Sequence, residues 1–370
     1  MQVEIKPKPA RRLFPTPYLQ QTAYWSKLKE KHGRRTAAFD IMINPASRAE
    51  SPDGDMGIVL RRIAPGTTMA YVPSGPELLP DTEMRGLWLE EISERLRPHL
   101  PEDCLFIRYD LPWRSPWADE PDRYTENARW KGPPKMRIQE MRMNYDTEYW
   151  NLRKAPTDLL PPDTVLVDLC VEPDGILSRM KPKTRYNIGL SARKGVRVRD
   201  AGVNGLQAWY ALYAGTAERH GMHLDDMSYF RAALEVSDAD CDSPARVHLL
   251  LAETAGRPLA GIMLAISGTR ATYLYGASSS AALDRGFMAS YALQWEAIRR
   301  ARESGCLEYD MFGVAPSPDP DHPMYGLYRF KTGFGGRIQH RQGCWDYPFD
   351  EARYDMYRAS EMAGAQFAVS

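Results

Sequence analysis

The residues between Tyr325 and Gly336 combine one lysine with aromatic rings and glycines at a spacing that suits ligand binding. The segment reads Tyr-Gly-Leu-Tyr-Arg-Phe-Lys-Thr-Gly-Phe-Gly-Gly. Glycine lets the backbone approach a ligand closely, aromatic faces offer stacking surfaces, and the ammonium of Lys331 is a compact positive charge. This combination predicts an anionic, partly flat ligand. The alternative is a short helix docked on the core, with Lys331 directed to water.

A carboxylate and a pair of tyrosines are the next candidates for chemistry. Asp110 follows the apolar pattern 104–109, where it could form an Asx turn that ends the strand. Tyr273 and Tyr275 alternate along a predicted strand, so we expect both side chains on one face. Rings at that spacing suit a substrate cleft or core packing equally.

A basic run occupies the chain between Arg179 and Arg199 and contains no acidic residue. We predict one helix over 176–194, which would direct half of these side chains to solvent. Such a surface suits phosphate groups, although a solvated helix face explains it as well. The basic residues are Arg179, Lys181, Lys183, Arg185, Arg193, Lys194, Arg197 and Arg199.

The composition is that of a globular protein with no overall attraction to nucleic acid or membranes. The chain has 370 residues, of which 43% are hydrophobic and 26% charged, and its 48 basic residues balance 48 acidic ones. The five cysteines are scattered without metal-ligand spacing, so we expect reduced thiols, no metal and a cytoplasmic location. The sequence has no run of 18 apolar residues and no signal-like start, so we expect neither a membrane span nor export.

The predicted elements repeat one layout twice. In the second half, a strand and helices precede three strands joined by hairpin turns, then a helix and a last strand, as in acyltransferases of the GNAT type. The first half follows this order more loosely. The predicted strands are 37–43, 57–63, 68–72, 104–109, 164–171, 196–200, 245–254, 259–266, 271–277 and 307–312, and the predicted helices are 23–32, 82–96, 176–194, 204–219, 227–236 and 288–303.

Several short segments between about residue 20 and residue 336 match, in order, the segments of one known family. The clearest are Gln21–Trp25 with Lys27 and Lys29, Phe106–Pro112, Thr164–Leu169, Met180–Ile188, Tyr273–Ser278, Tyr309–Gly313 and Gly326–Phe334. Through these segments the sequence resembles the Fem-type (FemABX) aminoacyl transferases, which build the interpeptide bridge of peptidoglycan. The resemblance implies an α/β (α+β) fold of two GNAT-like domains in tandem, 1–163 plus 337–370 and 164–336, without a coiled-coil arm.

The resemblance also implies a reaction. Fem-type enzymes pass an amino acid from aminoacyl-tRNA to the side-chain amine on the stem peptide of a peptidoglycan precursor, which is a UDP-linked muropeptide or lipid II. Lys331 and Phe330 match the family's functional Phe-Lys pair, and Asp110 matches a proposed base. For substrate binding we expect Arg185, Tyr273, Tyr275, Tyr229 and one of the two lysines of the first helix. Of these two lysines we favour Lys29 over Lys27. We expect no cofactor beyond the tRNA co-substrate, a monomer, and at most peripheral contact with the membrane.

One departure from the family concerns the residues before Tyr229. Where some members carry a diphosphate-binding arginine, this chain has Asp225 and Asp226, which would repel phosphate and could instead bind a cationic amine. Two other functions stay open. An acetyl-CoA-dependent GNAT enzyme would need a pyrophosphate loop, and 283–289 misses its spacing. A non-catalytic module could bind tRNA or a cell-wall precursor.

Overall fold

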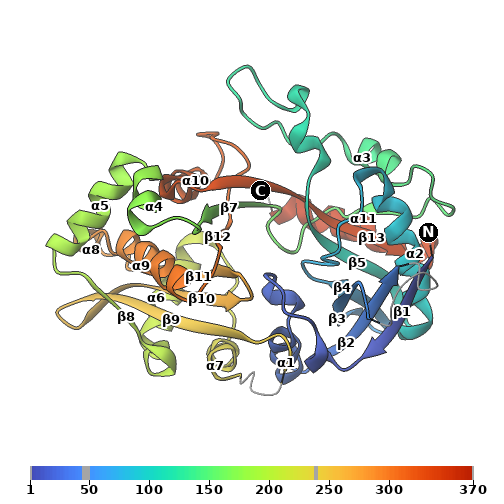
Figure 1. Ribbon diagram of the computed structural model, residues 1–370, viewed down its shortest axis with the longest axis horizontal. Coiled ribbons are helices and arrows are strands. Elements are labelled where there is room, and N and C mark those ends of the chain that lie inside the picture. The colour runs from blue at the N-terminus through green and yellow to red at the C-terminus, as the bar shows by residue number, and fades with distance from the viewer. Residues whose placement is uncertain (1, 44–50, 237–240, 369–370) are drawn as a thin grey trace. The chain divides into compact units, whose positions relative to one another are not determined.

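The computed structural model describes residues 2–43, 51–236 and 241–368, which divide into two compact units (Figure 1). Unit 1 comprises Met1–Phe14, Gln20–Pro162 and His340–Ser370. Unit 2 comprises Pro15–Leu19 and Asp163–Gln339. Each unit has its own set of paired strands and its own hydrophobic core.

Unit 1 is built on the strand order β1-β2-β3-β4-β5-β13, in which only β4 and β5 run parallel. Trp88, Leu89, Ile92 and Leu96 recur at helical spacing and bury one face of α2 in the core. The elements are β1 Val3–Lys8, α1 Ala23–Lys31, β2 Arg35–Ile43, β3 Gly54–Ala64, β4 Thr67–Val72, α2 Arg85–Leu96, β5 Cys104–Arg114, α3 Met136–Met143, β6 Arg153–Lys154, β13 Arg337–Pro348 and α11 Glu351–Ala368, with short 3-10 helices at Ala10–Arg12, Leu19–Gln21, Thr82–Met84, Arg97–His99, Pro116–Asp119 and Pro121–Arg123.

Unit 2 is built on the order β7-β12-β11-β10-β9-β8, in which only β11 and β12 run parallel. Its elements are β7 Asp163–Asp168, α4 Pro173–Arg179, α5 Pro182–Arg193, β8 Arg197–Asp200, α6 Leu206–His220, α7 Met227–Glu235, β9 Ala245–Thr254, β10 Arg257–Ser267, β11 Arg270–Ser278, α8 Ala282–Arg285, α9 Ala289–Glu303, β12 Glu308–Gly313 and α10 Tyr325–Lys331, with 3-10 turns at Gly202–Gly205 and Thr332–Phe334.

Helices pack on both faces of the unit 2 sheet. On one face, Leu293, Ala297 and Ile298 of α9 share a buried cluster with Ile262 and Leu264 of β10. On the other face, α6 approaches so closely that a Cβ on Gly261 would lie 2.6 Å from the ring of Trp209. The two faces of this sheet are therefore distinct environments.

The predicted meander of β9, β10 and β11 is confirmed, and its first turn shows why. Ala255 and Gly256 at the β9–β10 turn have φ of 46° and 75°. Positive φ at both central residues matches the right-handed twist of a hairpin, and glycine adopts it without strain.

Two of the predicted boundaries that are wrong lie at prolines. The helix predicted over 176–194 is two helices, because Met180 and Lys181 are extended and Pro182 starts α5. Conversely, β5 does not end before Pro112 but continues to Arg114. The pairing of β5 with β13 shifts register between Leu111 and Arg114, and an irregularity of this kind accommodates a proline.

Candidate active site

Lys331 is buried in unit 2 at the end of α10. Its side chain is only 4% exposed, and Nζ donates a hydrogen bond to the carbonyl oxygen of Gly313 at 2.6 Å. Nζ also lies 5.2 Å from the centroid of the Tyr273 ring. The second interpretation of this segment, a short helix docked on the core, is correct for α10. Its prediction that Lys331 is directed to water is wrong.

The backbone around Gly313 departs from regular strand geometry. The pairing of β12 with β7 is irregular between Asp310 and Gly313, and Phe312 has a φ of 61°. This left-handed conformation costs a bulky residue about 1 to 3 kcal/mol, so the surrounding structure must hold it in place. Asp310 contributes by accepting hydrogen bonds from the Phe312 N–H at 2.8 Å and from the Thr164 hydroxyl.

Burial and a nearby carboxylate shift the pKa of Lys331 in opposite directions. Desolvation lowers its pKa to about 8, while the charge of buried Asp310 raises it. Lys331 therefore stays mostly protonated at neutral pH, in surroundings where a charge acts strongly on its neighbours. Such a group can stabilise negative charge that forms on a reacting oxygen.

The ammonium lies where two parallel strands separate. The ladder between β11 and β12 joins Arg270–Thr272 to Glu308–Asp310, and the described chain has no pair between these strands beyond Thr272 and Asp310. Tyr273 of β11 and Gly313 of β12, which both contact Lys331, follow this last pair, where the two strands are no longer paired. Ligands of α/β sheets bind outside the carboxyl ends of parallel strands, so this position suits a substrate.

Phe330 is half-buried next to Lys331. Its ring meets Tyr291 of α9 edge-on at 5.1 Å and Phe334 at 5.3 Å between centroids. These contacts hold the last turn of α10 against α9 and thereby position the lysine.

Tyr273 and Tyr275 point to opposite faces of the sheet, so the prediction that they share one face is wrong. A bulge places Leu274 between the pairs Leu264–Tyr273 and Met263–Tyr275. Tyr273 consequently packs with the α9 cluster and Lys331. Tyr275 packs on the α6 and α7 side.

The α6 and α7 side forms an aromatic cluster around Tyr275. Its ring lies 5.2 Å from Phe230 and 6.5 Å from Tyr229, and the hydroxyls of Tyr275 and Tyr229 are 3.4 Å apart. Burial raises the pKa of Tyr275 well above its usual value. Asp226, one of the two carboxylates before Tyr229, caps α7 by accepting the Ser228 N–H at 2.8 Å.

All eight basic residues between Arg179 and Arg199 are exposed. Arg179 pairs with Asp168 at 2.7 Å and Arg199 with Glu253 at 3.1 Å. Arg185 donates to the carbonyl oxygens of Met180 and Ser178 at the end of α4. We call the remaining six, Lys181, Lys183, Arg185, Arg193, Lys194 and Arg197, the α5 basic surface.

The α5 basic surface begins beside the Lys331 segment. The Lys181 N–H donates to the Gly333 carbonyl at 2.9 Å, and Lys181 Nζ lies 3.3 Å from the Thr332 hydroxyl. A Cβ on Gly333 would lie 2.5 Å from Thr184 Oγ1, so α5 and the turn after α10 need a glycine there. The α5 basic surface and the buried ammonium are thus neighbours in unit 2.

Asp110 lies in unit 1, within β5 and opposite Cys344 of β13. It is 5% exposed, and Oδ2 accepts hydrogen bonds from the Tyr71 hydroxyl at 3.0 Å and the Leu160 N–H at 2.9 Å. Burial, followed by the charge of Asp158, raises its pKa to about 6. Because β5 continues past it, the alternative of a strand-ending Asx turn is wrong.

Lys27 and Lys29 lie in α1 of unit 1, which starts where the Thr22 side chain accepts the Trp25 N–H at 3.2 Å. Lys29 Nζ sits 4.1 Å from the centroid of the Trp25 ring. Lys27 is exposed. The ring contact fixes the direction of Lys29 and distinguishes it from Lys27.

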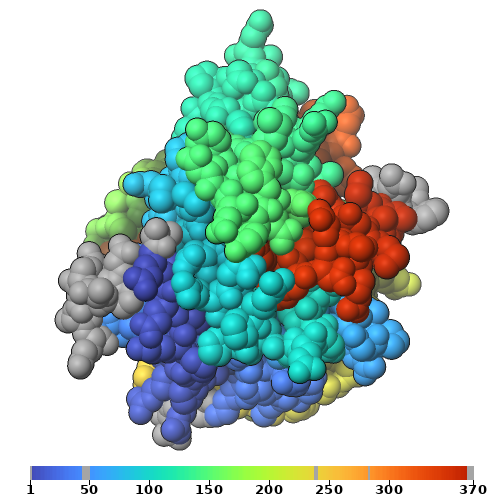
Figure 2. Space-filling view, turned by 90° about the vertical axis from the view of Figure 1, so that its right-hand side faces the viewer, coloured from blue at the N-terminus to red at the C-terminus, as the bar shows by residue number. Residues whose placement is uncertain are grey.

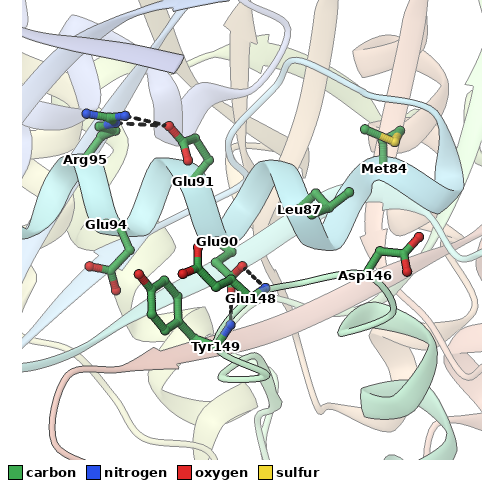
Figure 3. A pocket seen from close by; sticks show the side chains of 9 residues that line it. All are labelled: Met84, Leu87, Glu90, Glu91, Glu94, Arg95, Asp146, Glu148 and Tyr149. Carbon is green, nitrogen blue, oxygen red and sulfur yellow. Dashed lines mark hydrogen bonds and ion pairs between the residues drawn. The ribbon is translucent and has the colours of Figure 1, made fainter. Parts of the chain in front are cut away.

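Unit 1 also has a surface pocket of about 570 Å³ that contains none of the predicted site residues. Figure 3 shows its acidic lining, with Glu90 accepting the backbone N–H groups of Glu148 and Tyr149 and with Glu91 paired to Arg95. Glu94 and Asp146 add further carboxylates. A pocket of this charge repels phosphates and does not suit the ligand predicted for Lys331.

Sequence reasoning missed the partners that hold the two candidate groups. Tyr71, Asp158 and Cys344 surround Asp110, and Asp310 lies beside Lys331. A polar residue inside an apolar strand, as in Tyr309-Asp310-Met311, was the available signal for Asp310. The contacts of Asp110 join segments distant in sequence and gave no local signal.

The fold is similar to that of a protein of known structure. The crystal structure of FemX superimposes with a TM-score of 0.70 at 18% identity, over 93% of this chain and 96% of that one. This likeness confirms the predicted mixed α/β fold. The helices described in unit 2 reach at most 15 residues, so the described part of this unit has no long helical arm.

The sequence comparison gives the family. The FemAB family model matches residues 14–239 and 248–361, and the chain belongs to the FemAB family. The lipid II:glycine glycyltransferase of Staphylococcus epidermidis is 24% identical over 253 residues, or 53% of this chain and 60% of that protein. The protein of the same name from Staphylococcus aureus is 24% identical over 258 residues, or 53% and 61%. The matched region thus spans about 60% of these relatives' length.

Proposed function

We propose that this protein transfers an amino acid from aminoacyl-tRNA to the side-chain amine of the stem peptide of a peptidoglycan precursor. The acceptor is a UDP-linked muropeptide or lipid II. Membership of the FemAB family and the names of the two staphylococcal relatives support aminoacyl transfer in bridge synthesis. The chemistry of unit 2 supports the use of a charged tRNA.

The observation that carries this proposal is the buried ammonium of Lys331. An ammonium has three N–H donors, and within the described chain the Gly313 carbonyl is its one hydrogen-bond acceptor. The other donors are therefore available to a bound ester. They would stabilise the oxyanion as it forms, at a place where burial strengthens the interaction.

The reaction that we propose breaks one ester and forms one amide. The acceptor amine attacks the carbonyl carbon of the aminoacyl ester, and the tetrahedral oxyanion is stabilised by Lys331. The bond to the ribose oxygen then breaks, and the amine proton passes to Asp110 or to the leaving oxygen. No cofactor is required.

Asp110 is the proposed proton acceptor because its pKa of about 6 leaves it ionised yet basic near neutral pH. The Tyr71 hydroxyl and the Leu160 N–H donate to Oδ2, and the Cys344 thiol also hydrogen-bonds the carboxylate. A route through the leaving oxygen would make Asp110 dispensable.

Apart from Arg185, the cations of the α5 basic surface are assigned to the phosphates of the tRNA acceptor end. The side chains of this surface are exposed, and it touches the turn after α10 through Lys181. Tyr186, 61% exposed on the same helix, offers a ring for a base. Phe330 and Tyr273 would contact the terminal nucleotide or the aminoacyl group beside Lys331.

Lys29, with Lys27 as the second choice, and Arg185 would bind the phosphates of the precursor, and the cluster of Tyr275 and Tyr229 would contact its peptide. Where some family members use an arginine, this chain has Asp226, and its carboxylate caps α7. We expect the enzyme to act as a cytoplasmic monomer.

Transfer of labelled amino acid tests this function. The purified protein is incubated with a set of labelled aminoacyl-tRNAs and with UDP-muropeptide or lipid II, and label is followed into the stem peptide. We expect transfer that Lys331→Ala abolishes and Lys6→Ala, a change at an exposed lysine of unit 1, leaves intact. Transfer from acetyl-CoA instead, or precursor binding without turnover with any charged tRNA, would contradict the proposal.

A further inference from the structure

Helix α3 of unit 1 presents apolar side chains to solvent. Ile138 is 49% exposed, Met141 54% and Tyr145, just beyond the helix, 60%. The spacing of three residues between Ile138 and Met141 places these two on one side of the helix. The opposite side is already occupied, because Gln139 and Met143 are buried. These exposed groups are therefore additional to those that fasten α3 to the core.

Cations accompany this apolar face. Arg129, Lys131 and Lys135 precede α3, Arg137 lies within it, and all four are exposed. Lys131 Nζ donates to the carbonyl oxygen of Asp122 at 2.9 Å. The only acidic residue from position 129 to 145 is Glu140, which is engaged by Arg358 at 2.7 Å and by the Lys154 N–H at 3.0 Å. We call these four cations together with Ile138, Met141 and Tyr145 the α3 surface.

The α3 surface rests on a fixed support. The buried ring of Trp130 stacks on His340 with centroids 4.5 Å apart. Arg142 pairs with Glu83 and Glu120 at 3.0 Å each and lies 4.8 Å from the centroid of Trp117. Figure 1 shows the chain before α3 extending away from the sheet of unit 1, and in Figure 2 its teal atoms project at the top. The surface is thus held in place and accessible.

We propose that the α3 surface docks unit 1 on an anionic lipid bilayer. Ile138 and Met141 would enter the boundary between headgroups and acyl chains, and the ring of Tyr145 suits the headgroup level. The four cations would meet lipid phosphates while their aliphatic stems cover apolar surface. The chain has no helix, among the residues described, that could cross a bilayer, so contact through this surface is peripheral.

Other occupants fit the α3 surface less well. A second copy of the chain would bring like cations together across a two-fold interface. The acidic pocket of Figure 3 marks the edge of the surface, because Asp146, Glu148 and Tyr149 follow directly in the chain and the two carboxylates carry the opposite charge. The inference rests on this surface alone and stands apart from the proposed reaction, although a lipid II acceptor would lie in the same bilayer.

Vesicle sedimentation with the full chain tests the inference. Binding is measured to vesicles of phosphatidylglycerol mixed with phosphatidylcholine and to vesicles of phosphatidylcholine alone, at low and high salt. We expect binding to the anionic vesicles that salt weakens. Replacing Lys135 and Arg137 by Gln should weaken it about fivefold per cation. Ile138→Ser with Met141→Ser should weaken it about tenfold or more.

The matched controls are Met356→Ser, which changes a 69% exposed methionine of α11, and Arg62→Gln, which changes an exposed cation of β3. Both should bind as the parent does. Equal binding to neutral and anionic vesicles, or equal loss in the controls, would overturn the proposal. So would a dimer in solution that Ile138→Ser with Met141→Ser dissociates.

Discussion

Lys331 in unit 2 and Asp110 in unit 1 are both buried ionisable groups, but their hydrogen bonding differs. Lys331 gives one of its three donors to Gly313. The Asp110 carboxylate accepts hydrogen bonds from the Tyr71 hydroxyl, the Leu160 N–H and the Cys344 thiol. The lysine therefore keeps capacity for a ligand, whereas the carboxylate also fastens the segment around Leu160. Burial alone does not separate a functional group from a structural one, and the count of unused donors or acceptors is more informative.

Replacing Asp110 by Asn tests the carboxylate half of this comparison. Asparagine retains an oxygen for Tyr71 and Leu160 but cannot accept the amine proton. We expect transfer to slow about 100-fold or more, the range of general base catalysis, while the variant stays folded. Steady-state transfer assays and urea unfolding measure the two effects. Unchanged transfer would assign Asp110 a structural role and give the proton to the leaving oxygen.

The pH dependence of stability should separate the two groups by sign. The pKa of Lys331 is about 8 in the folded chain and near 10.5 when unfolded, so the unfolded state binds more protons between these values. Relative to Lys331→Met, the parent should gain on the order of 2 kcal/mol as pH rises from about 8 to 10.5.

Asp110 should behave in the opposite way. Its pKa is about 6 when folded and 3.8 when unfolded, so the folded state binds more protons between these values. Relative to Asp110→Asn, the parent should lose stability as pH rises from about 4 to 6. Urea unfolding at a series of pH values measures both differences. If the stability difference changed in the same direction with rising pH for both residues, the environments assigned to them would be wrong.

Tyr273→Leu should have a smaller effect on transfer. The variant keeps apolar packing but removes the ring face that lies 5.2 Å from Lys331 Nζ. A contact of this kind contributes about 0.5 to 1 kcal/mol, so we expect transfer to fall about two- to fivefold. Tyr275→Leu, on the opposite face, provides the comparison and should not change the pH dependence of transfer. A shift in that dependence with Tyr275→Leu alone would contradict the assignment of faces.

The sequence predicted the elements of both units better than it predicted side-chain direction. The hairpin turn at Ala255-Gly256 and the apolar spacing of α2 are local features, so their structure follows from neighbouring residues. The bulge at Leu274 has no glycine or proline to announce it, yet it reverses the face of Tyr275. Pro182, in contrast, was a visible signal for the break between α4 and α5.

The sequence identified residues of the candidate site, but it did not reveal which residues they contact. The rings and glycines around Lys331 indicated a ligand site, but the direction of its side chain depends on Gly313 and Tyr273 from other elements. Asp110 was recognised, whereas Pro112 suggested a strand end that the register shift to β13 removes. Long-range pairing decides such details, and a single sequence does not contain it in readable form.

Single-turnover transfer by Lys331→Met tests the central claim most directly. Methionine fills a similar volume without a charge, so the fold should persist, and circular dichroism checks this. With saturating aminoacyl-tRNA and precursor, we predict that the transfer step slows about 100-fold or more, while the dissociation constant for tRNA changes less than about threefold. A transfer step at the parent's rate, or a loss confined to tRNA binding, would contradict the account.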